Sequence, residues 1–425
     1  MPRGASRRRA TPAAEAAGAA LHALDTTAAF AVGVRPAQEV CDSIDRDAFL
    51  HAGPPIELDE VVGPARGALI GALMFEGEAA DVVEAERILE RGALSLRPCH
   101  DAGAVGAMSG VVSPSMPVVV VETETGARTF SPLNEGLGKA LRFGSHDDDV
   151  LERLAWMSRV AAPLLDAALQ DIGGLDVIAL QAEGLRRGDE CHNRNVASTA
   201  AVLSRLAPSI IRNASSAADA ADVCSYVANN PHFFLSFSIS ACKAVADAAQ
   251  QTDDPGVVTA MCANGRSFGV RVSGLGARWF LVDAPVGEPK LFHGFTPEDV
   301  CPAIGDSYIT EAVGLGAFAL SAAPALSEFV GGDPMQSSEL VAELRRICRG
   351  TSSRFVLPFE GFRGTPLGID VRLVAETGIA PLVNNGLAHR LPGIGQVGAG
   401  LTRLPLEPFV AAARALLPES ERAWS

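Results

Sequence analysis

Hydrophobic residues recur at steps of three and four positions through the middle of the chain. The pattern runs through DVLERLAWMSRVAAPLLDAALQDI, DVIALQAEGLRRG, ASTAAVLSRLAPSII and SYVANNPHFFLSFSISACKAVADAAQ, between residues 147 and 250. A period near 3.6 places the apolar side chains of such a stretch on one face of a helix. The pattern therefore predicts a helical middle domain over residues 147–250.

Shorter apolar runs, bounded by glycine and proline, lie on both sides of this helical stretch. Residues 67–75 (GALIGALMF) and 117–123 (PVVVVET) are predicted to be buried strands, whereas residues 79–93 are typical of an acidic amphipathic helix. Farther along, the strand pattern returns in VVTAMCANG, SFGVRVSG and ARWFLVD, followed by glycine-rich turns. We predict a mixed α+β fold, with an N-terminal α/β domain over residues 38–146, the helical middle domain and a C-terminal glycine-rich α/β domain over residues 251–425.

The N-terminus begins with a basic, small-residue run, MPRGASRRRATPAAEAAGAALHALDTTAAF. Glu15, His22 and Asp25 interrupt this run, so it lacks the apolar segment of a signal peptide. We predict a disordered or loosely packed tail over residues 1–37. No apolar run reaches the roughly eighteen residues that a membrane span needs, and VVSPSMPVVVVE is broken by prolines. A cytoplasmic protein is expected.

Composition narrows the classes of partner. The chain has 425 residues, 48% of them hydrophobic and 20% charged, which is typical of a folded protein. Its 35 basic and 50 acidic residues give a net charge of −15, which disfavours a nucleic-acid or anionic-membrane partner. Eight cysteines without zinc-type spacing indicate free thiols in a reducing compartment.

Signatures of metal, serine-hydrolase and dinucleotide chemistry are missing from the sequence. There is no HExxH and no GxSxG. The one GxGxxG, at residues 393–398, has no strand before it and no acid about twenty residues after it. We therefore expect neither a metal ion nor a cofactor, and a stand-alone amidohydrolase is disfavoured.

Residues 188–198, GDECHNRNVAS, gather polar side chains next to an apolar helical stretch: Asp189, Glu190, His192, Arg194 and Asn195. Asp189 is predicted to cap the following helix, with His192 and Asn195 on one face of its first turns. Glu190 and Arg194 are spaced for an ion pair on the adjacent face. Helix capping with a surface ion pair explains this pattern. A polar-ligand site does so equally, because free N–H groups at a helix start attract anions.

Residues 133–144, LNEGLGKALRFG, join a glycine-rich turn to two cations. Their polar and turn residues are Asn134, Glu135, Gly136, Lys139 and Arg142. The arrangement is of the phosphate-cradle type, although the GxxxxGK[ST] loop of nucleotide-binding proteins is absent. A simple turn with two solvated cations is the alternative.

Further polar residues lie in PCHDAG and in the C-terminal loops. Cys99 is not expected to act as a nucleophile, because neighbours on a strand point to opposite faces and His100 would not pair with it. His100 is either a site-lining donor or a structural histidine. The remaining candidates are Arg271 in NGRSFGVRVSGLG, Asp306, Ser307 and Glu311 in IGDSYITE, and Asn384, His389 and Gln396 in the glycine-dense run over residues 376–400.

Taken together, these motifs occur in a recognisable order from about residue 45 to about residue 410. They are HAGPP, FEG, PCH, LNEGxGKxxRFG, GDExHxRNxAS, TAMxxNGxxFGxRVSGLGxRWF, GDSxITE, LGxDxRxVxETGIxPLxNxGxAH and GIGQxGAG. The chain resembles the AllG (YlbE-like) family, a subunit of oxamate carbamoyltransferase. The resemblance implies phosphorolysis of oxalurate to oxamate and carbamoyl phosphate in allantoin and purine catabolism. It also implies three α+β domains with a helical insert.

The same resemblance implies a multi-subunit complex with an FdrA-type subunit and a third subunit, and a homodimer is among the expected assemblies. Asn385, Arg390 and Tyr308 differ from the residues usual in the family motifs, so a related carbamoyl or acyl transferase with another donor is an alternative. A second alternative is a non-catalytic scaffold whose polar loops form an interface with the FdrA-type chain.

Carbamoyl transfer to phosphate must hold two anions and polarise the carbamoyl oxygen. We expect Lys139 and Arg142, with the turn over residues 136–138, to hold one anion, and Asn134, Glu135 and Gly136 are counted among the substrate-binding residues. Arg271 or Arg194 would hold the other. The proton donor is expected to be His192 or His389. Asn195, Asn384 and Gln396 would recognise amide edges, while Glu190 and Asp189 orient His192 and Arg194.

Overall fold

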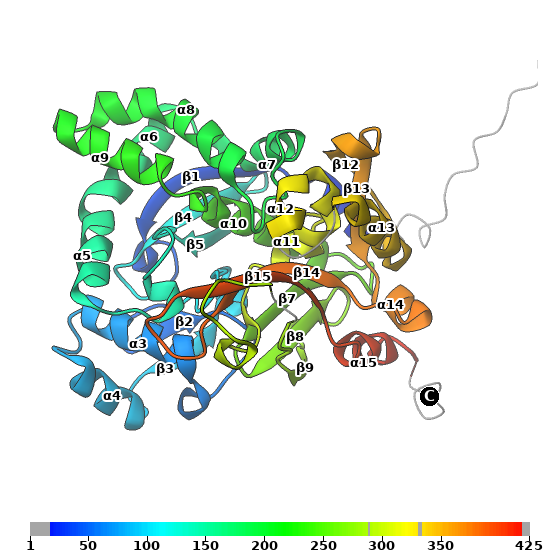
Figure 1. Ribbon diagram of the computed structural model, residues 1–425, viewed down its shortest axis with the longest axis horizontal. Coiled ribbons are helices and arrows are strands. Elements are labelled where there is room, and N and C mark those ends of the chain that lie inside the picture. Colours follow the sequence, from blue (N-terminus) through cyan, green and yellow to red (C-terminus); the bar gives the residue numbers. More distant parts are fainter. Residues whose placement is uncertain (1–17, 288–289, 330–333, 419–425) are drawn as a thin grey trace, which may run out of the picture.

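The structure is a computed structural model that describes residues 18–287, 290–329 and 334–418 (Figure 1). Several small sheets and many helices surround α10, which crosses the middle of the molecule (Figure 1). The predicted mixed α+β fold is therefore confirmed. Among the described residues, no helix is both long and apolar enough to cross a membrane.

A four-stranded antiparallel sheet has the order β5-β4-β1-β6. Its strands are β1 (Ala29–Pro36), β4 (Pro117–Thr123), β5 (Arg128–Pro132) and β6 (Leu175–Asp176). The predicted strand over residues 117–123 is confirmed as β4. Its run of valines is apolar on both faces because Val118 and Val120 pack into one hydrophobic cluster while Val119 and Val121 pack into another.

The predicted tail over residues 1–37 is wrong from residue 19 onward. There the chain forms α2 (Ala19–Thr26) and then β1, which pairs with both β4 and β6. The start of α2 is fixed by Asp254, whose carboxylate accepts hydrogen bonds from the backbone N–H groups of Gly18 and Ala20. These contacts come from a segment 234 or more positions away, so local composition could not indicate them. Residues 1–17 lie outside the described residues.

The stretch predicted to be helical is confirmed. It contains α5 (Asp148–Trp156), a π-helical turn (Met157–Ala161), α6 (Ala162–Asp171), α7 (Val177–Arg186), α8 (Val196–Asn213), α9 (Ala217–Ala228) and α10 (Phe233–Gln250). Its outer boundaries stay predictions. Strand β6 lies within it and pairs with β1, so this stretch also contributes to the N-terminal sheet.

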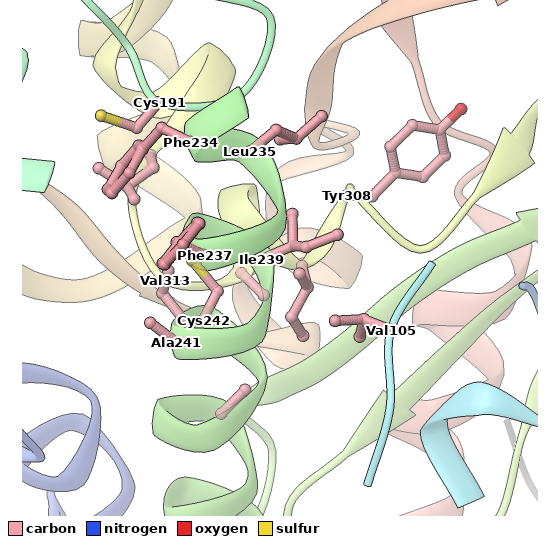
Figure 2. Packing of buried hydrophobic residues seen from close by; sticks show 14 of the residues in the cluster. Val105, Cys191, Phe234, Leu235, Phe237, Ile239, Ala241, Cys242, Tyr308 and Val313 are labelled. Atoms are coloured by element: carbon pink, nitrogen blue, oxygen red, sulfur yellow. The ribbon is translucent and has the colours of Figure 1, made fainter. Parts of the chain in front are cut away.

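Helix α10 is buried along almost its whole length. It contacts β4 and β5 on one side and β7 (Val258–Asn264) and α11 (Ile309–Ala312) on the other. Figure 2 shows Phe234 and Phe237 pointing to one side of the helix and Leu235 and Ile239 toward the other. Because its small and apolar residues are buried on every side, α10 is enclosed by other elements and forms the centre of the core.

The segment over residues 67–75 is helical, so its predicted strand is wrong. It belongs to α3 (Gly63–Phe75), which begins with a proline in its first turn. A fully apolar run is compatible with either element, and here the 13-residue length marks a buried helix. A Cβ atom on Gly67 would lie 2.4 Å from the carbonyl oxygen of Gly144. The glycine therefore lets α3 pack directly against the turn that carries Arg142.

The C-terminal part contains three further sheets. The predicted strands after residue 257 are confirmed as β7, β8 (Ser267–Val272) and β9 (Phe280–Asp283), which with β11 (Ile304–Gly305) form a sheet of order β11-β7-β8-β9. The other two sheets have the orders β10-β15-β14 and β12-β13. Their strands are β10 (Lys290–Leu291), β14 (Leu382–Ala388), β15 (Gln396–Arg403), β12 (Cys348–Leu357) and β13 (Arg363–Ile369).

The remaining elements lie toward the outside of the molecule (Figure 1). Strands β2 (Ala48–His51) and β3 (Ser95–Pro98) form a parallel pair. The amphipathic helix predicted over residues 79–93 is confirmed as α4 (Val82–Glu90). The other helices are α12 (Pro324–Phe329), α13 (Pro334–Leu344), α14 (Val371–Thr377) and α15 (Glu407–Ala415).

Candidate active site

Segments that are far apart in the sequence line one small cavity of about 20 Å³. Its walls come from the loop after β3, the turn before α5, the loop before α8, the start of α10, the turn after β11, and β14 with β15. The lining residues are Ala107, Met108, Arg142, Phe143, His192, Asn193, His232, Leu235, Ser307, Gly386 and Gln396. A neighbouring cavity of about 30 Å³ shares Ala107 and Arg142 with it and is lined in part by Asn134 and Glu135.

Residues 189–195 form a loop between α7 and α8, so the helical face predicted to carry His192 and Asn195 is wrong. The buried carboxylate of Glu190 organises this loop. It accepts hydrogen bonds from the backbone N–H groups of His192 (2.8 Å), Asn193 (2.5 Å) and Arg194 (2.7 Å). Burial raises the pKa of Glu190 to about 7. Glu190 therefore binds backbone N–H groups of the loop, and the predicted ion pair between Glu190 and the side chain of Arg194 is not formed.

Asp189 is fully buried, whereas the side chain of Arg194 is partly exposed. The predicted N-cap position at Asp189 is wrong, because α8 begins after Asn195; Asp189 instead reaches across the loop and accepts hydrogen bonds from the backbone N–H (2.8 Å) and the hydroxyl (2.9 Å) of Ser198 in the first turn of α8. Burial raises the pKa of Asp189. The guanidinium of Arg194 donates to the carbonyl of Gly188 and lies 3.6 Å from Asp189. Arg194 is absent from the cavity lining.

His192 forms a buried pair with Glu311. Its Nδ1 lies 2.9 Å from a carboxylate oxygen of Glu311, and both side chains are at most 4% exposed. Burial lowers the pKa of His192, but the Glu311 carboxylate outweighs that effect and the net direction is upward. Among the described residues no hydrogen-bond partner lies at Nε2, and the ring lines the cavity. The pair therefore presents a protonatable nitrogen to the cavity.

Glu311 was noted in the sequence but given no role. It follows the GDS turn on α11, and its carboxylate also accepts hydrogen bonds from the hydroxyl of Thr310 (2.8 Å) and the backbone N–H of Asn384 (3.0 Å). The 119 positions that separate it from His192 explain why spacing did not reveal the pair.

The predicted amide residues divide into two groups. Asn384 and Asn195 support the loop: Asn384 accepts from Asn193 (3.0 Å) and donates to Glu190 (3.4 Å), and Asn195 donates to the carbonyl of His192 (2.7 Å). Neither lines the cavity, whereas Gln396 does, next to Asn193. The cavity therefore has two carboxamide groups in its wall, one of which was absent from the prediction.

Arg142 is the buried cation of the cavity wall. Its side chain is 9% exposed in all, and its Nη2 donates to the carbonyl of Gly136 (2.7 Å). Its Nε is buried without a hydrogen-bond partner among the described residues. Burial lowers the pKa of Arg142, and the nearby Glu135 carboxylate opposes that effect. Such a guanidinium, with unused donors beside a cavity, is suited to binding an anion.

The turn before Arg142 is built by its own polar residues. Glu135 accepts hydrogen bonds from the backbone N–H groups of Leu141 (2.5 Å) and Arg142 (3.1 Å), and burial raises its pKa. Asn134 accepts from the backbone N–H of Gly136 (3.0 Å). Lys139 instead lies at the surface, where its ammonium pairs with Asp147 at 2.9 Å. Of the two predicted cations of this segment, only Arg142 reaches the cavity.

Two further candidates, Arg271 and His389, lie outside the cavity lining. Arg271 pairs with Asp101, and its guanidinium lies 4.1 Å from the ring centre of Trp279. His389 lies 3.4 Å from Asp299, and its Nδ1 accepts a hydrogen bond from the backbone N–H of Leu391. Both side chains therefore have partners away from the cavity, although Nε of Arg271, like that of Arg142, is buried without a hydrogen-bond partner among the described residues.

His232 lines the cavity and was not among the predicted site residues. It lies at the start of α10, where its sequence context, NNPHFF, resembles any turn before a helix. Burial, together with the nearby charges of Arg142 and His192, lowers the pKa of His232 to about 3. The cavity therefore has one imidazole that favours the proton and one that stays neutral.

This chain is similar to known proteins over most of its length. A family model described as "Oxamate carbamoyltransferase subunit AllG" matches residues 94–307. A protein of that description from Escherichia coli (strain K12) is 44% identical over 389 residues, which are 90% of this chain and 92% of that protein. The uncharacterized protein YahG from the same strain is 38% identical, over 92% of this chain and 82% of its own length.

One solved structure shows the same fold. It is the crystal structure of a conserved protein of unknown function from Enterococcus faecalis V583, with a TM-score of 0.92 and 39% identity. The match covers 95% of this chain and 97% of that chain. Because a relative 44% identical is matched over nearly its full length, this chain belongs to the AllG family.

Proposed function

We propose that this chain is a subunit of an oxamate carbamoyltransferase and that the cavity between Arg142 and His192 holds the reacting carbamoyl group. The reaction would convert oxalurate and phosphate to oxamate and carbamoyl phosphate, as a step of allantoin catabolism, with an FdrA-type subunit and a third subunit. The name of the 44% identical relative supports this class of activity. Unused donors on a buried guanidinium are the observation that carries the assignment of the site.

Arg142 would bind the carboxylate of oxalurate or oxamate. Oxalurate carries one carboxylate and phosphate is a second anion, so at least one cation has to offset their repulsion. A buried guanidinium binds a planar carboxylate through two parallel hydrogen bonds, and such bonds are strong where water is excluded. Asn193 and Gln396 in the same wall would hydrogen-bond to the amide groups of the substrate.

His192 would supply the proton. Phosphate attacks the carbamoyl carbon, a C–O bond forms, and the C–N bond to oxamate breaks. The departing nitrogen then needs one proton to leave as a neutral amide. The Glu311 carboxylate holds Nδ1 and favours the protonated imidazole, so that Nε2 can donate into the cavity. Glu190 and Asn384 act as positioning residues because they fix the backbone of the loop that carries His192.

Convergence of the motif loops favours a site over a scaffold surface. A scaffold would spread its polar loops over a flat face, whereas six separate segments here line one concave space. The scaffold alternative makes a distinct prediction, because substitutions inside the cavity would then leave the rate of the assembled enzyme unchanged.

The test measures carbamoyl phosphate formation from oxalurate and phosphate, coupled through carbamate kinase to ATP synthesis. The chain is assayed alone and together with its FdrA-type and third subunits. We expect His192→Gln and Arg142→Ala to lower kcat/KM of the active preparation by about 10²-fold or more. Lys139→Ala, in the same turn but at the surface, should keep wild-type activity. Full activity of both cavity variants would overturn the proposed site.

A further inference from the structure

A second cluster of chemistry-bearing side chains lies behind the wall of the cavity. The imidazole of His100, the thiol of Cys262 and the carboxylate of Asp306 each offer one atom, and these atoms lie within 4.8 Å of one another. All three residues are buried, with His100 the most exposed at 5%. They come from the turn after β3, from β7 and from the turn after β11. Because these segments are far apart in the sequence, residue spacing does not predict the cluster.

The cluster contains an unmatched polar atom. Nε2 of His100 is buried and has no hydrogen-bond partner among the described residues. The nearest oxygen of Asp306 is 3.7 Å away, which is too long for a hydrogen bond. Burial lowers the pKa of His100 well below its usual value, so the ring is neutral and Nε2 can act as a lone-pair donor. A buried polar atom without a partner points to a missing ligand.

The donor set is suited to a borderline-soft divalent cation. Zinc binds imidazole nitrogen, thiolate sulfur and carboxylate oxygen, and neighbouring ligand atoms in a tetrahedral site are roughly 3.3–3.7 Å apart. The distances between the three atoms here would need to shorten by about 1.5 Å at most. A thiolate and a carboxylate together carry the two negative charges that balance such a cation. On binding, the thiol of Cys262 releases one proton to solvent, and Asp306 does so wherever it is protonated.

Neighbouring groups bear on this chemistry. The thiol of Cys99 lies beside Asp306 but donates to the carbonyl of Gly110 at 3.5 Å, so it already has a hydrogen-bond partner and is not counted among the ligands. The neighbouring cations are Arg271 on β8, which pairs with Asp101, and Lys243 on α10, whose ammonium is held by Asp247 one turn away. The ion pair with Asp247 weakens the repulsion between Lys243 and a cation bound in the cluster.

We propose that His100, Cys262 and Asp306 form a structural site for a zinc-like divalent cation. The carboxylate of Asp306 already accepts hydrogen bonds from the backbone N–H groups of Gly53 (2.6 Å) and Gly106 (2.8 Å). A bound cation would fix these loops to β7. Two of the attached segments line the cavity, since Ser307 follows Asp306 and Ala107 follows Gly106. The role of the cation is therefore to hold the cavity wall, and the proposal stands whether or not the proposed transfer reaction is correct.

The test titrates the purified full chain, stripped by a chelator, with Co²⁺ and then with Zn²⁺. We expect one equivalent of Co²⁺ per chain, a sulfur-to-cobalt charge-transfer band, and displacement of that band by Zn²⁺. Zn²⁺ should also raise the Tm of the wild-type chain.

Cys262→Ser should abolish the charge-transfer band, while Asp306→Asn and His100→Ala should lower the Co²⁺ affinity at least tenfold. Cys301→Ser removes another buried thiol, outside the cluster, and should leave the band unchanged. A wild-type chain that takes up less than a tenth of an equivalent and shows no Tm shift would overturn the proposal. So would a band that persists in Cys262→Ser or disappears in Cys301→Ser.

Discussion

The pair formed by His192 and Glu311 predicts a pH-dependent loss of stability in Glu311→Gln. In the wild-type chain the pKa of His192 is raised above its ordinary value of about 6.5. The pair therefore stabilises the fold fully below that ordinary value, and its contribution is lost as the pH rises through the folded pKa. With an amide at position 311 burial dominates, the imidazole favours its neutral form, and this contribution disappears.

The magnitude follows from the contacts of the pair. A charge-assisted hydrogen bond contributes about 1.5–3 kcal/mol and a neutral one about 0.5–1.5 kcal/mol. Breaking a buried ion pair costs up to about 3–5 kcal/mol when the partner has to stay charged, but His192 can lose its proton. We therefore expect Glu311→Gln to lower the free energy of unfolding by about 2 kcal/mol at pH 6. This difference should shrink as the pH is raised toward 9.

Urea denaturation followed by circular dichroism, at several pH values from 5.5 to 9, measures this difference. Glu183→Gln is the matched control, because Glu183 pairs with Arg187 and Arg205 at the surface. It should cost less than about 1 kcal/mol at every pH. A loss in Glu311→Gln that is the same at pH 6 and pH 9, or no larger than in the control, would refute the account of the pair.

Three further outcomes are expected. Gly67→Ala should lower the free energy of unfolding by about 1–3 kcal/mol, because the clash with Gly144 outweighs the better helix propensity, and a raised Tm would contradict this. Asp254→Asn should loosen α2 and speed limited proteolysis near residue 18, whereas an unchanged cleavage rate would show that other contacts hold the helix. His232→Asn should keep the shape of the wild-type pH–rate profile of the assembled enzyme between pH 5 and 8, because His232 stays neutral there; a shifted profile would contradict this.

Sequence patterns correctly predicted helices that bury one face. They failed for a helical run that is apolar throughout and for a strand whose burial depends on distant segments. The helices between residues 147 and 250 were found because their apolar residues keep helical spacing. The run over residues 67–75 is apolar throughout, so periodicity could not separate a buried helix from a buried strand. Strand β1 was missed because its small residues acquire their burial from β4, α6 and α10.

The candidate site was predictable in its residue types but not in its geometry. The motifs containing Arg142, His192 and Gln396 were each identified, and the structure brings these three to one cavity. The partner of His192 could not be predicted, because Glu311 meets it only through the tertiary fold. Lys139 is exposed whereas Arg142 is buried. The sequence does not reveal this difference, because the two cations lie only three positions apart in the same segment.

The central position of α10 has a consequence for synthesis of the chain. This helix is synthesised before β7 and α11, which cover part of its surface. Until then, its side chains on that face have only water or other chains to contact, which is the condition under which nascent proteins aggregate. A chaperone that binds phenylalanine-rich helices would therefore raise the yield of folded protein, whereas slow translation after residue 250 would lower it.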